Sequence, residues 1–255
     1  MKRTWEFQFL LMYPKIQNGA ILIADTHEDD KRDGFYSFLQ KIESNKIVTT
    51  QLFLMGDMFD LFIGKIEYSV QKYQKYIDML EKIALNIEVF YFEGNHDFSL
   101  SNLFKNVKTV PIQLQPKKFI LKDNTLIYLS HGDKYCGFIY NNYTKIIRLS
   151  IVLKILNIVD KMCNNFISKK IKSNQSKKKL CIKIKDFEKI IRLKILQYNI
   201  EQKSWIIEGH YHQNSRFKIN KVNYINLPSF ACGGSYFIVE CLNYKKEFFK
   251  QLGYK

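Results

Sequence analysis

The sequence predicts an α/β fold in which strands and helices form layers around one hydrophobic core, interrupted by a helical insertion. Three observations support this: short apolar runs that end in polar turns, helical periodicity between the first of these runs, and a change of pattern late in the chain. The chain has 255 residues, 46% hydrophobic and 25% charged, which suits a globular protein and excludes a disordered or fibrous one. Its length is about 1.7 times that of an ordinary domain, so we expect one large domain or a core plus an insertion.

Five apolar runs are expected to be buried strands whose carboxyl ends carry polar loops. The runs are 20–24, 52–55, 89–92, 126–129 and 205–207. Helices are expected over 35–42 and 68–85, and the alternation of strand and helix predicts a layered βαβ-type core. Later, short strands at 216–222, 224–227 and 236–242 are joined by Asn, Pro and Gly-Gly turns. They predict a mixed sandwich with an antiparallel closing half.

Residues 138–200 differ from the rest of the chain in composition. They contain 15 Lys and Arg but 3 Asp and Glu, a local charge of +12 out of +16 for the whole chain, and 146–159 is almost wholly apolar. We therefore expect a core of 1–137 and 201–255 with a helical cap inserted at 138–200. Two simpler explanations are open: the lysines form a solvated helix face, and the apolar stretch forms a small hydrophobic core within the cap. The positive excess also favours an anionic partner: a nucleic acid, a phosphorylated substrate or an acidic membrane surface.

The five cysteines are odd in number and include no Cys-x-x-Cys pair. They predict neither a disulfide framework nor a structural zinc site, and they favour a reducing compartment. We expect them to be small buried hydrophobes. No window reaches the ~18 uninterrupted apolar residues of a spanning helix, and the N-terminus makes a poor secretory signal. The sequence therefore predicts a protein that is soluble or lies on a membrane without crossing it.

All the histidines of the chain lie in the loops that follow the predicted strands: His27, His96, His131, His210 and His212. Loops at the carboxyl edge of a sheet converge, so these rings are expected to meet. Imidazoles, carboxylates and an Asn amide form a nitrogen and oxygen donor set that suits two metal ions. Asp57, directly after Gly56, is the natural carboxylate to bridge cations ~3.5–4 Å apart. Such a pair acidifies water and neutralises phosphoryl oxygens.

The order of these loops resembles the calcineurin-like metallophosphoesterase superfamily. The matching blocks are Asp25-x-His27, Gly56-Asp57-x-x-Asp60, Gly94-Asn95-His96-Asp97, His131 and Gly209-His210-x-His212. The resemblance implies a β-sandwich flanked by helices and two divalent metals, with Mn²⁺ expected and Fe, Zn or Co also suitable. One metal would be held by Asp25, His27, Asp57 and His212, and the other by Asp57, Asn95, His131 and His210. His96 would face the substrate phosphate and stabilise or protonate the leaving group, with Asp97 orienting it.

A closer resemblance lies in the way His131-Gly132-Asp133 leads through Cys136 into the basic insertion. This is similar to the UDP-2,3-diacylglucosamine diphosphatase family of lipid A biosynthesis. It implies cleavage of the substrate pyrophosphate to UMP and 2,3-diacylglucosamine 1-phosphate, a cap that holds acyl chains, and docking on the anionic inner membrane from the cytoplasm. The expected substrate-binding residues are Asn95, His96, Lys177, Lys178, Ile151 and Leu153. The best-known branch has Arg where this chain has His96, the superfamily's usual residue, and residues 1–19 are an addition.

Two other functions fit part of the pattern. A metallophosphoesterase of the same superfamily can act on a soluble phosphodiester, nucleotide or phosphoprotein. A nucleic-acid or membrane binder with an incidental metal site is a third hypothesis, but we expect no nucleic-acid partner and infer no protein partner. Asp60 and Asp133 are expected to orient metal ligands. Loop roles are the default for Glu93, Glu208, Asp29, Asp30 and Asp33.

Overall fold

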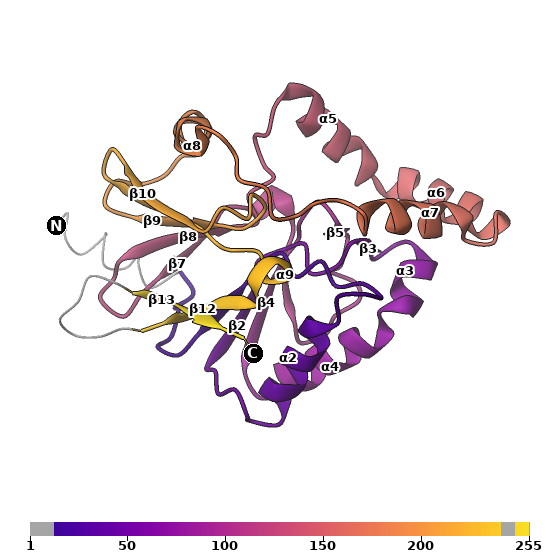
Figure 1. Cartoon of the computed structure of the whole chain (residues 1–255), viewed down its shortest axis with the longest axis horizontal. Coiled ribbons are helices and arrows are strands. Elements are labelled where there is room, and N and C mark those ends of the chain that lie inside the picture. Colours follow the sequence, from indigo (N-terminus) through magenta and orange to yellow (C-terminus); the bar gives the residue numbers. More distant parts are fainter. Residues whose placement is uncertain (1–12, 241–247, 255) are drawn as a thin grey trace.

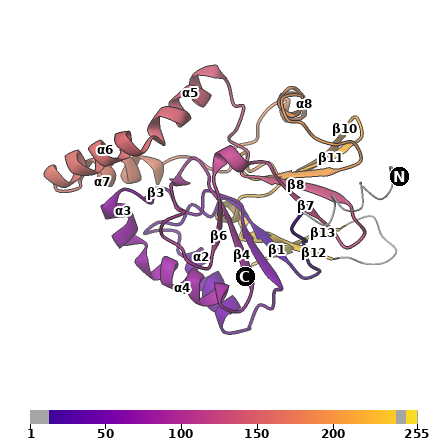
Figure 2. The ribbon, with the colours of Figure 1, turned by 180° about the vertical axis from the view of Figure 1, so that it is seen from behind.

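The computed structural model describes residues 13–240 and 248–254. In this part of the chain two mixed sheets pack face to face, with helices on both outer faces and a group of helices projecting to one side (Figure 1). The predicted α/β fold class is confirmed. The layers run from α2 and α4 through the first sheet and the second sheet to α8, and the reverse view shows the same order (Figure 2).

The first sheet has the strand order β13-β12-β1-β2-β4-β6. Its strands are β1 (Ile21–Ile23), β2 (Gln51–Leu54), β4 (Glu88–Phe92), β6 (Lys108–Val110), β12 (Ser235–Val239) and β13 (Phe249–Gly253). Strands β1, β2, β4 and β6 are parallel to their neighbours in this group, whereas β12 is antiparallel to β1 and to β13. Its outer face is covered by α2 (Gly34–Glu43) and α4 (Gln74–Ala84), and α3 (Glu67–Lys72) lies before α4, toward the projecting helices.

The second sheet has the order β10-β11-β9-β8-β7. Its strands are β7 (Lys117–Ile120), β8 (Leu126–Ser130), β9 (Trp205–Glu208), β10 (Ser215–Ile219) and β11 (Val222–Asn226). Because side chains alternate along a strand, β1 is buried on both sides: Leu22 packs with Phe53 and Ile207 between the sheets, while Ile21 and Ile23 face the helices. This double burial explains why the central strands read as continuous apolar runs.

The projecting cap helices are α5 (Phe138–Ile147), α6 (Ser150–Met162) and α7 (Phe166–Gln175). The next helix, α8 (Phe187–Ile195), behaves differently, because its Phe187 and Ile191 pack with Tyr224 on the outer face of the second sheet. The remaining short elements are β3 (Phe62–Ile63), β5 (Asp97–Phe98), η1 (Ile112–Leu114) and α9 (Phe230–Gly233). We propose that the core includes α8 and that the cap proper consists of the cap helices alone.

Two predicted elements differ in their bounds. The helix predicted over 68–85 is two helices, because Tyr73 leaves the helical conformation at φ −105° and ψ 16°. The centre of its ring lies 4.2 Å from that of Phe59. The turn between β10 and β11 falls at Asn220, whose φ is +54°, rather than at residue 223. Strands β3, β5, β6, β7 and β13 were not predicted. They are short or partly polar, and pairing with other strands defines them: β3 with β5, β6 with β4, β7 with β8 and β13 with β12.

The expectation about the cysteines is wrong in two respects. Cys181 and Cys232 form a disulfide bond, and the four described cysteines are exposed rather than buried. Cys181 and Cys232 lie 51 residues apart, so only the fold brings them together. Cys241 and the last residues of the strand predicted at 236–242 lie outside the described residues. Among the described residues, no helix has the length and apolar character needed to cross a bilayer.

Candidate metal centre

The predicted metal ligands converge at one edge of the sandwich. Strands β1, β2 and β4 are parallel in one sheet, β8 and β9 are parallel in the other, and the loops after these strands carry the ligands. Left-handed backbone conformations, which non-glycine residues rarely adopt, occur at five of these positions: Asp25, His27, Asp57, His210 and His212. Such strain persists where the surrounding fold enforces it and is concentrated at functional sites.

Three groups of donor atoms lie close enough to hold a cation, with all atoms of a group within 4.8 Å of one another. The groups are Asp25 with His27 and His212, Asp57 with His131 and His210, and His27 with Asp57 and His96. Asp57 therefore lies between the two clusters proposed from the motif order. Asn95 joins the second cluster, because its Oδ1 lies 3.3 Å from His131 Nε2.

The orientation of the histidine rings suits metal coordination. His131 Nδ1 lies 2.9 Å from the Met55 carbonyl oxygen and His212 Nδ1 lies 2.8 Å from that of Leu180. The opposite nitrogens face carboxylates, with His131 Nε2 3.4 Å from Asp57 and His212 Nε2 3.2 Å from Asp25. Fixing one ring nitrogen on a carbonyl is the usual way in which proteins orient a metal-ligating histidine.

His27 gives the clearest sign that the site fits a cation. Its Nδ1 contacts the Asp60 carboxylate at 3.2 Å, but its buried Nε2 has no hydrogen-bond partner among the described residues. A buried polar atom without a partner is costly, and a metal ion bound by Asp25, His27 and His212 would satisfy this nitrogen. Asp60 thus has the orienting position expected for it.

Two glycines allow the loops to approach this closely. A Cβ atom on Gly56, whose φ is +89°, would overlap the His131 ring, and one on Gly94 would overlap the Asp57 carboxylate. Both loops therefore need a residue without a side chain. This explains physically why glycine directly precedes Asp57 and Asn95 in the motifs.

The electrostatic environment keeps Asp57 ionised. Burial opposes the charged form, but His131 and then His96 hold the pKa of Asp57 well below its usual range. Burial lowers the pKa of His131, yet the Asp57 charge outweighs it and raises that pKa well above the ordinary value. In the chain without metal, the raised pKa of His131 favours a proton on its ring, which a cation must displace. Metal binding should therefore release protons and weaken as the pH falls.

Asp97 does not orient His96 as expected. Its carboxylate accepts hydrogen bonds from the backbone N–H groups of Asp57, Met58 and Gly94 and from the Tyr91 hydroxyl. His96 Nδ1 instead lies 3.0 Å from the Asp60 carbonyl oxygen. The reason is geometric: Asp97 begins β5 and points inward, so it organises the Asp57 loop instead.

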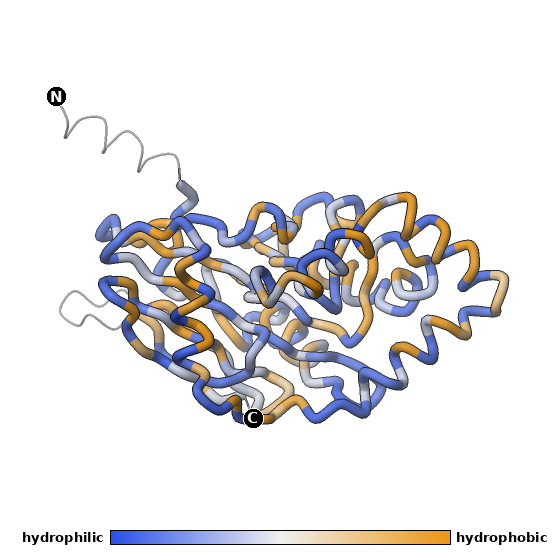
Figure 3. The backbone as a smooth tube through the Cα atoms, turned by 90° about the horizontal axis from the view of Figure 1, so that it is seen from above, coloured by the Kyte–Doolittle hydropathy of each residue, from blue (hydrophilic) through white to orange (hydrophobic). Residues whose placement is uncertain are grey.

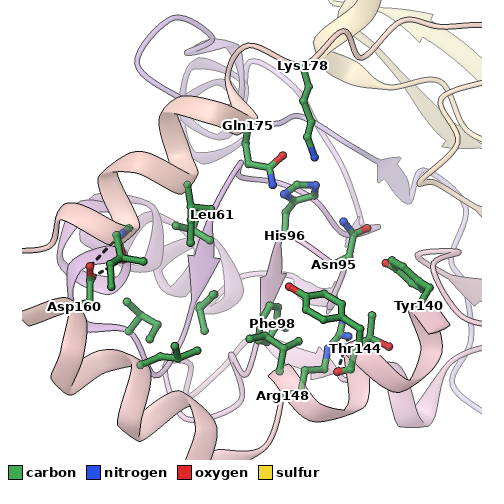
Figure 4. A pocket seen from close by; sticks show the side chains of 18 residues that line it. Leu61, Asn95, His96, Phe98, Tyr140, Thr144, Arg148, Asp160, Gln175 and Lys178 are labelled. Atoms are coloured by element: carbon green, nitrogen blue, oxygen red, sulfur yellow. Dashed lines mark hydrogen bonds between the residues drawn. The ribbon is translucent and has the colours of Figure 1, made fainter.

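A cavity of about 360 Å³ lies between the cap helices and the metal centre (Figure 4). Asn95 and His96 line it, as do Gln175 and Lys178, which extend toward His96. The rest of the lining includes many apolar side chains: Leu61, Ile63, Ile66, Phe98, Ile147, Leu156, Ile167 and Ile171. Polar atoms of Tyr140 and Gln175 in this lining are buried without hydrogen-bond partners among the described residues.

Three expected substrate-binding residues do not line this cavity. Ile151 is 62% exposed on the outer side of α6, whereas Leu153 is fully buried against Ile66 and Phe98 of the core. Lys177 is exposed and absent from the lining. Ile151 and Leu153 lie about 200° apart around α6, which turns the first outward and the second toward the core.

Sequence reasoning missed several buried polar groups. Glu208, expected in a loop, ends β9 and bonds to Lys194 at 2.9 Å and Tyr198 at 2.8 Å. Asp29 is buried rather than solvated, and its carboxylate pairs with Arg32. Gln115 accepts the backbone N–H of His131 at 2.6 Å. The position of Glu208 directly after a predicted buried strand could have indicated that it is buried. No sequence feature around Gln115 indicates its role.

The fold and the cluster of acidic and histidine side chains together define a metal-dependent phosphoesterase. The family model described as calcineurin-like phosphoesterase matches residues 20–225. The chain therefore belongs to this family, and the predicted superfamily is confirmed. The site is a dimetal site of His and Asp groups typical of the family.

Several curated relatives carry one name, UDP-2,3-diacylglucosamine hydrolase. The protein from Haemophilus ducreyi is 27% identical over 202 residues, 76% of this chain and 83% of the relative. The protein from Shewanella piezotolerans is 25% identical over 199 residues, 76% of this chain and 82% of the relative. Among solved structures, an archaeal phosphodiesterase aligns with 91% of this chain and 98% of its own, at 12% identity and a TM-score of 0.45. A dimetal phosphatase from Danio rerio aligns with 94% of this chain and 100% of its own, at 12% identity and a TM-score of 0.41.

Proposed function

We propose that the protein hydrolyses the pyrophosphate of UDP-2,3-diacylglucosamine to UMP and 2,3-diacylglucosamine 1-phosphate. The single observation that carries this proposal is the cavity, which has His96 and Asn95 at one end and an apolar lining beyond them. A small soluble ester needs no apolar chamber beside the metals, whereas a substrate with acyl chains does. The names of the distant relatives support the same substrate.

The proposed chemistry assigns different tasks to the loops. Asp25, His27, Asp57 and His212 would hold one cation, and Asp57, Asn95, His131 and His210 the other. Divalent cations in this position supply a nucleophile from water near neutral pH and neutralise charge on the phosphoryl oxygens. The polar atoms of Tyr140 and Gln175 that have no hydrogen-bond partner within residues 13–240 and 248–254 are available to the polar part of the substrate.

His96 is proposed to hold a proton for the leaving group. Burial lowers its pKa, and Asp57 opposes that effect. Its Nδ1 faces the Asp60 carbonyl oxygen, so the ring donates there and its Nε2 is the atom left for the substrate. A bound phosphate would raise the pKa of the ring by its negative charge, which lets Nε2 carry a proton when the substrate is present.

The outer surface of the cap helices suits an anionic bilayer, which would place the protein on the cytoplasmic side of an inner membrane. Large apolar side chains including Ile151, Ile155 and Ile158 are exposed on α6, and Figure 3 shows hydrophobic stretches along the projecting helices. Exposed lysines such as Lys154 lie among them. A helix surface with apolar and cationic side chains binds the interface of anionic membranes.

The function is tested by turnover of UDP-2,3-diacylglucosamine with Mn²⁺ in mixed micelles, compared with bis(p-nitrophenyl) phosphate. Ile171→Asn changes the cavity wall and should raise KM for the lipid nucleotide about tenfold, since burial of an Ile side chain contributes roughly 1.5–3 kcal/mol. Hydrolysis of the small ester should stay within about twofold. The matched control is Leu193→Asn, exposed on α8 and away from the cavity.

Hydrolysis of soluble phosphodiesters, nucleotides or phosphoproteins without turnover of the lipid nucleotide would reject the substrate and favour the soluble-ester alternative. An equal effect of Ile171→Asn on both substrates would show that the cavity does not bind acyl chains.

A further inference from the structure

We propose that Arg148 is a positioning residue that couples the cap helices to the second metal cluster. Arg148 follows the last residue of α5 and stands at the junction with α6. Its side chain reaches back from the cap to the loops that carry Asn95 and His131. The motifs do not indicate this residue, because it lies in the insertion between the His131 motif and the Gly209-His210-x-His212 motif.

One guanidinium nitrogen of Arg148 contacts both loops. Its Nη2 donates to the carbonyl oxygen of Gly94 at 2.8 Å and lies 3.3 Å from Asp133 Oδ2. Gly94 is joined directly to Asn95, and Asp133 is two residues beyond His131. Asn95 and His131 in turn contact each other at 3.3 Å. Arg148 thus links the backbone next to Asn95 with the side chain of Asp133, in the loop that carries His131.

The pair formed by Arg148 and Asp133 is buried. Their side chains are 6% and 0% exposed, so each charge depends on the other. Removing one member of a buried pair is much more costly than losing a surface contact, because the other charge is left without compensation.

The same side chain also touches the cavity. The guanidinium lies 4.8 Å from the ring centre of Phe98, and both residues are in the cavity lining (Figure 4). A molecule in the cavity therefore contacts the group that holds the Gly94 carbonyl. This last step rests on the proposed function, whereas the link between Arg148 and the metal loops does not.

The experiment measures Mn²⁺ affinity of the full chain by calorimetry together with kcat and KM for bis(p-nitrophenyl) phosphate. Residues that support metal ligands typically contribute 10–100-fold to affinity or activity. We expect Arg148→Met to weaken Mn²⁺ binding and to lower kcat within that range, with KM for the small ester nearly unchanged. Arg148→Lys keeps the charge and should recover part of both losses.

Two controls separate positioning from general damage. Lys154→Met removes an exposed cation of the neighbouring helix and should leave Mn²⁺ affinity unchanged. Leu153→Ala loosens the contact between cap and core without touching Gly94 or Asp133 and should also leave it unchanged.

Wild-type Mn²⁺ affinity in Arg148→Met, or an equal loss in Leu153→Ala, would overturn the inference. Circular dichroism shows whether Arg148→Met folds. If it does not, the Mn²⁺ affinity of Arg148→Lys is measured instead, and an affinity equal to that of the wild type would contradict the proposal. Because neither readout uses the lipid nucleotide, failure of the proposed substrate leaves this result interpretable.

Discussion

The strand-end loops and the cap helices differ in what they bury: the loops bury charged and polar side chains, whereas the cap helices expose apolar ones. The loops hold Asp25, His27, Asp57 and His131 buried, on a backbone strained at several of these positions. The cap helices instead expose large apolar side chains and many lysines. Chemistry on phosphate needs donor atoms fixed within fractions of an ångström, so it is built on the strands. Binding of the proposed lipid substrate needs apolar surface, which the cap supplies.

The contact between the two regions is narrow and mixed in character. Leu153 packs on Phe98 and Ile66, Asn157 accepts the Glu67 backbone N–H at 2.9 Å, and ion pairs lie at the margin. The buried pair of Arg148 with Asp133 adds a further link, so a small apolar cluster, one buried ion pair and a few exposed pairs hold the cap. The following predictions test whether substitutions in the core and in the cap helices have separate effects.

The largest effect is expected at Asp57. Asp57→Asn keeps the shape but removes the negative charge placed between the two donor clusters. Loss of metal would remove several kcal/mol of transition-state stabilisation, so activity should fall by about 10³-fold or more. Elemental analysis should show fewer than two metals per chain. The exposed Asp123→Asn serves as the control, and retention of both metals at Asp57→Asn would contradict the bridging position.

A smaller and local effect is expected from a matched pair on α6. Leu153→Ala removes a fully buried side chain and should cost about 2–5 kcal/mol, measured as faster hydrogen exchange across the cap helices. Ile151→Ser changes an exposed side chain and should leave exchange nearly unchanged, while it reduces sedimentation with anionic vesicles. Equal exchange in both variants would show that α6 does not dock as described, and unchanged vesicle binding would argue against the membrane surface.

The smallest effect is expected at Asp30, which joins Lys72 of α3 and Lys172 of α7. Hydrogen bonds from these lysines lower the pKa of Asp30 to about 2, below its ordinary value of 3.8. Its contribution to stability is therefore present above pH 3.8 and lost as the pH falls through about 2. Because the carboxylate is 75% exposed, Asp30→Asn should cost less than about 1 kcal/mol.

Denaturant unfolding of wild type and Asp30→Asn across pH 2 to 6 checks this prediction. The difference between the two proteins should be constant above about pH 4 and should close toward pH 2. A difference that grows as the pH falls would have the wrong sign and would exclude the ion pairs as its source.

Much of the core was predictable because its signals are local. The double-sided burial of β1, β2 and β4 appears in the chain as apolar runs, and the polar loops that follow them mark the edge where ligands meet. The helix break at Tyr73 was not predicted. The Tyr73 ring packs against Phe59 and Phe62, which precede the helix and leave no mark on its local pattern. The disulfide between Cys181 and Cys232 likewise joins segments 51 residues apart.

The sequence alone determined which donor atoms are present, in which order they occur and that strand ends bring them to one edge, because strand burial and turn chemistry act over a few residues. The tertiary structure decided which way each group points. It turned Asp97 toward the Asp57 loop rather than His96, turned Ile151 outward and Leu153 inward, and brought Arg148 to Gly94. The physical reason is that packing between distant segments fixes side-chain direction, and no local pattern records those neighbours.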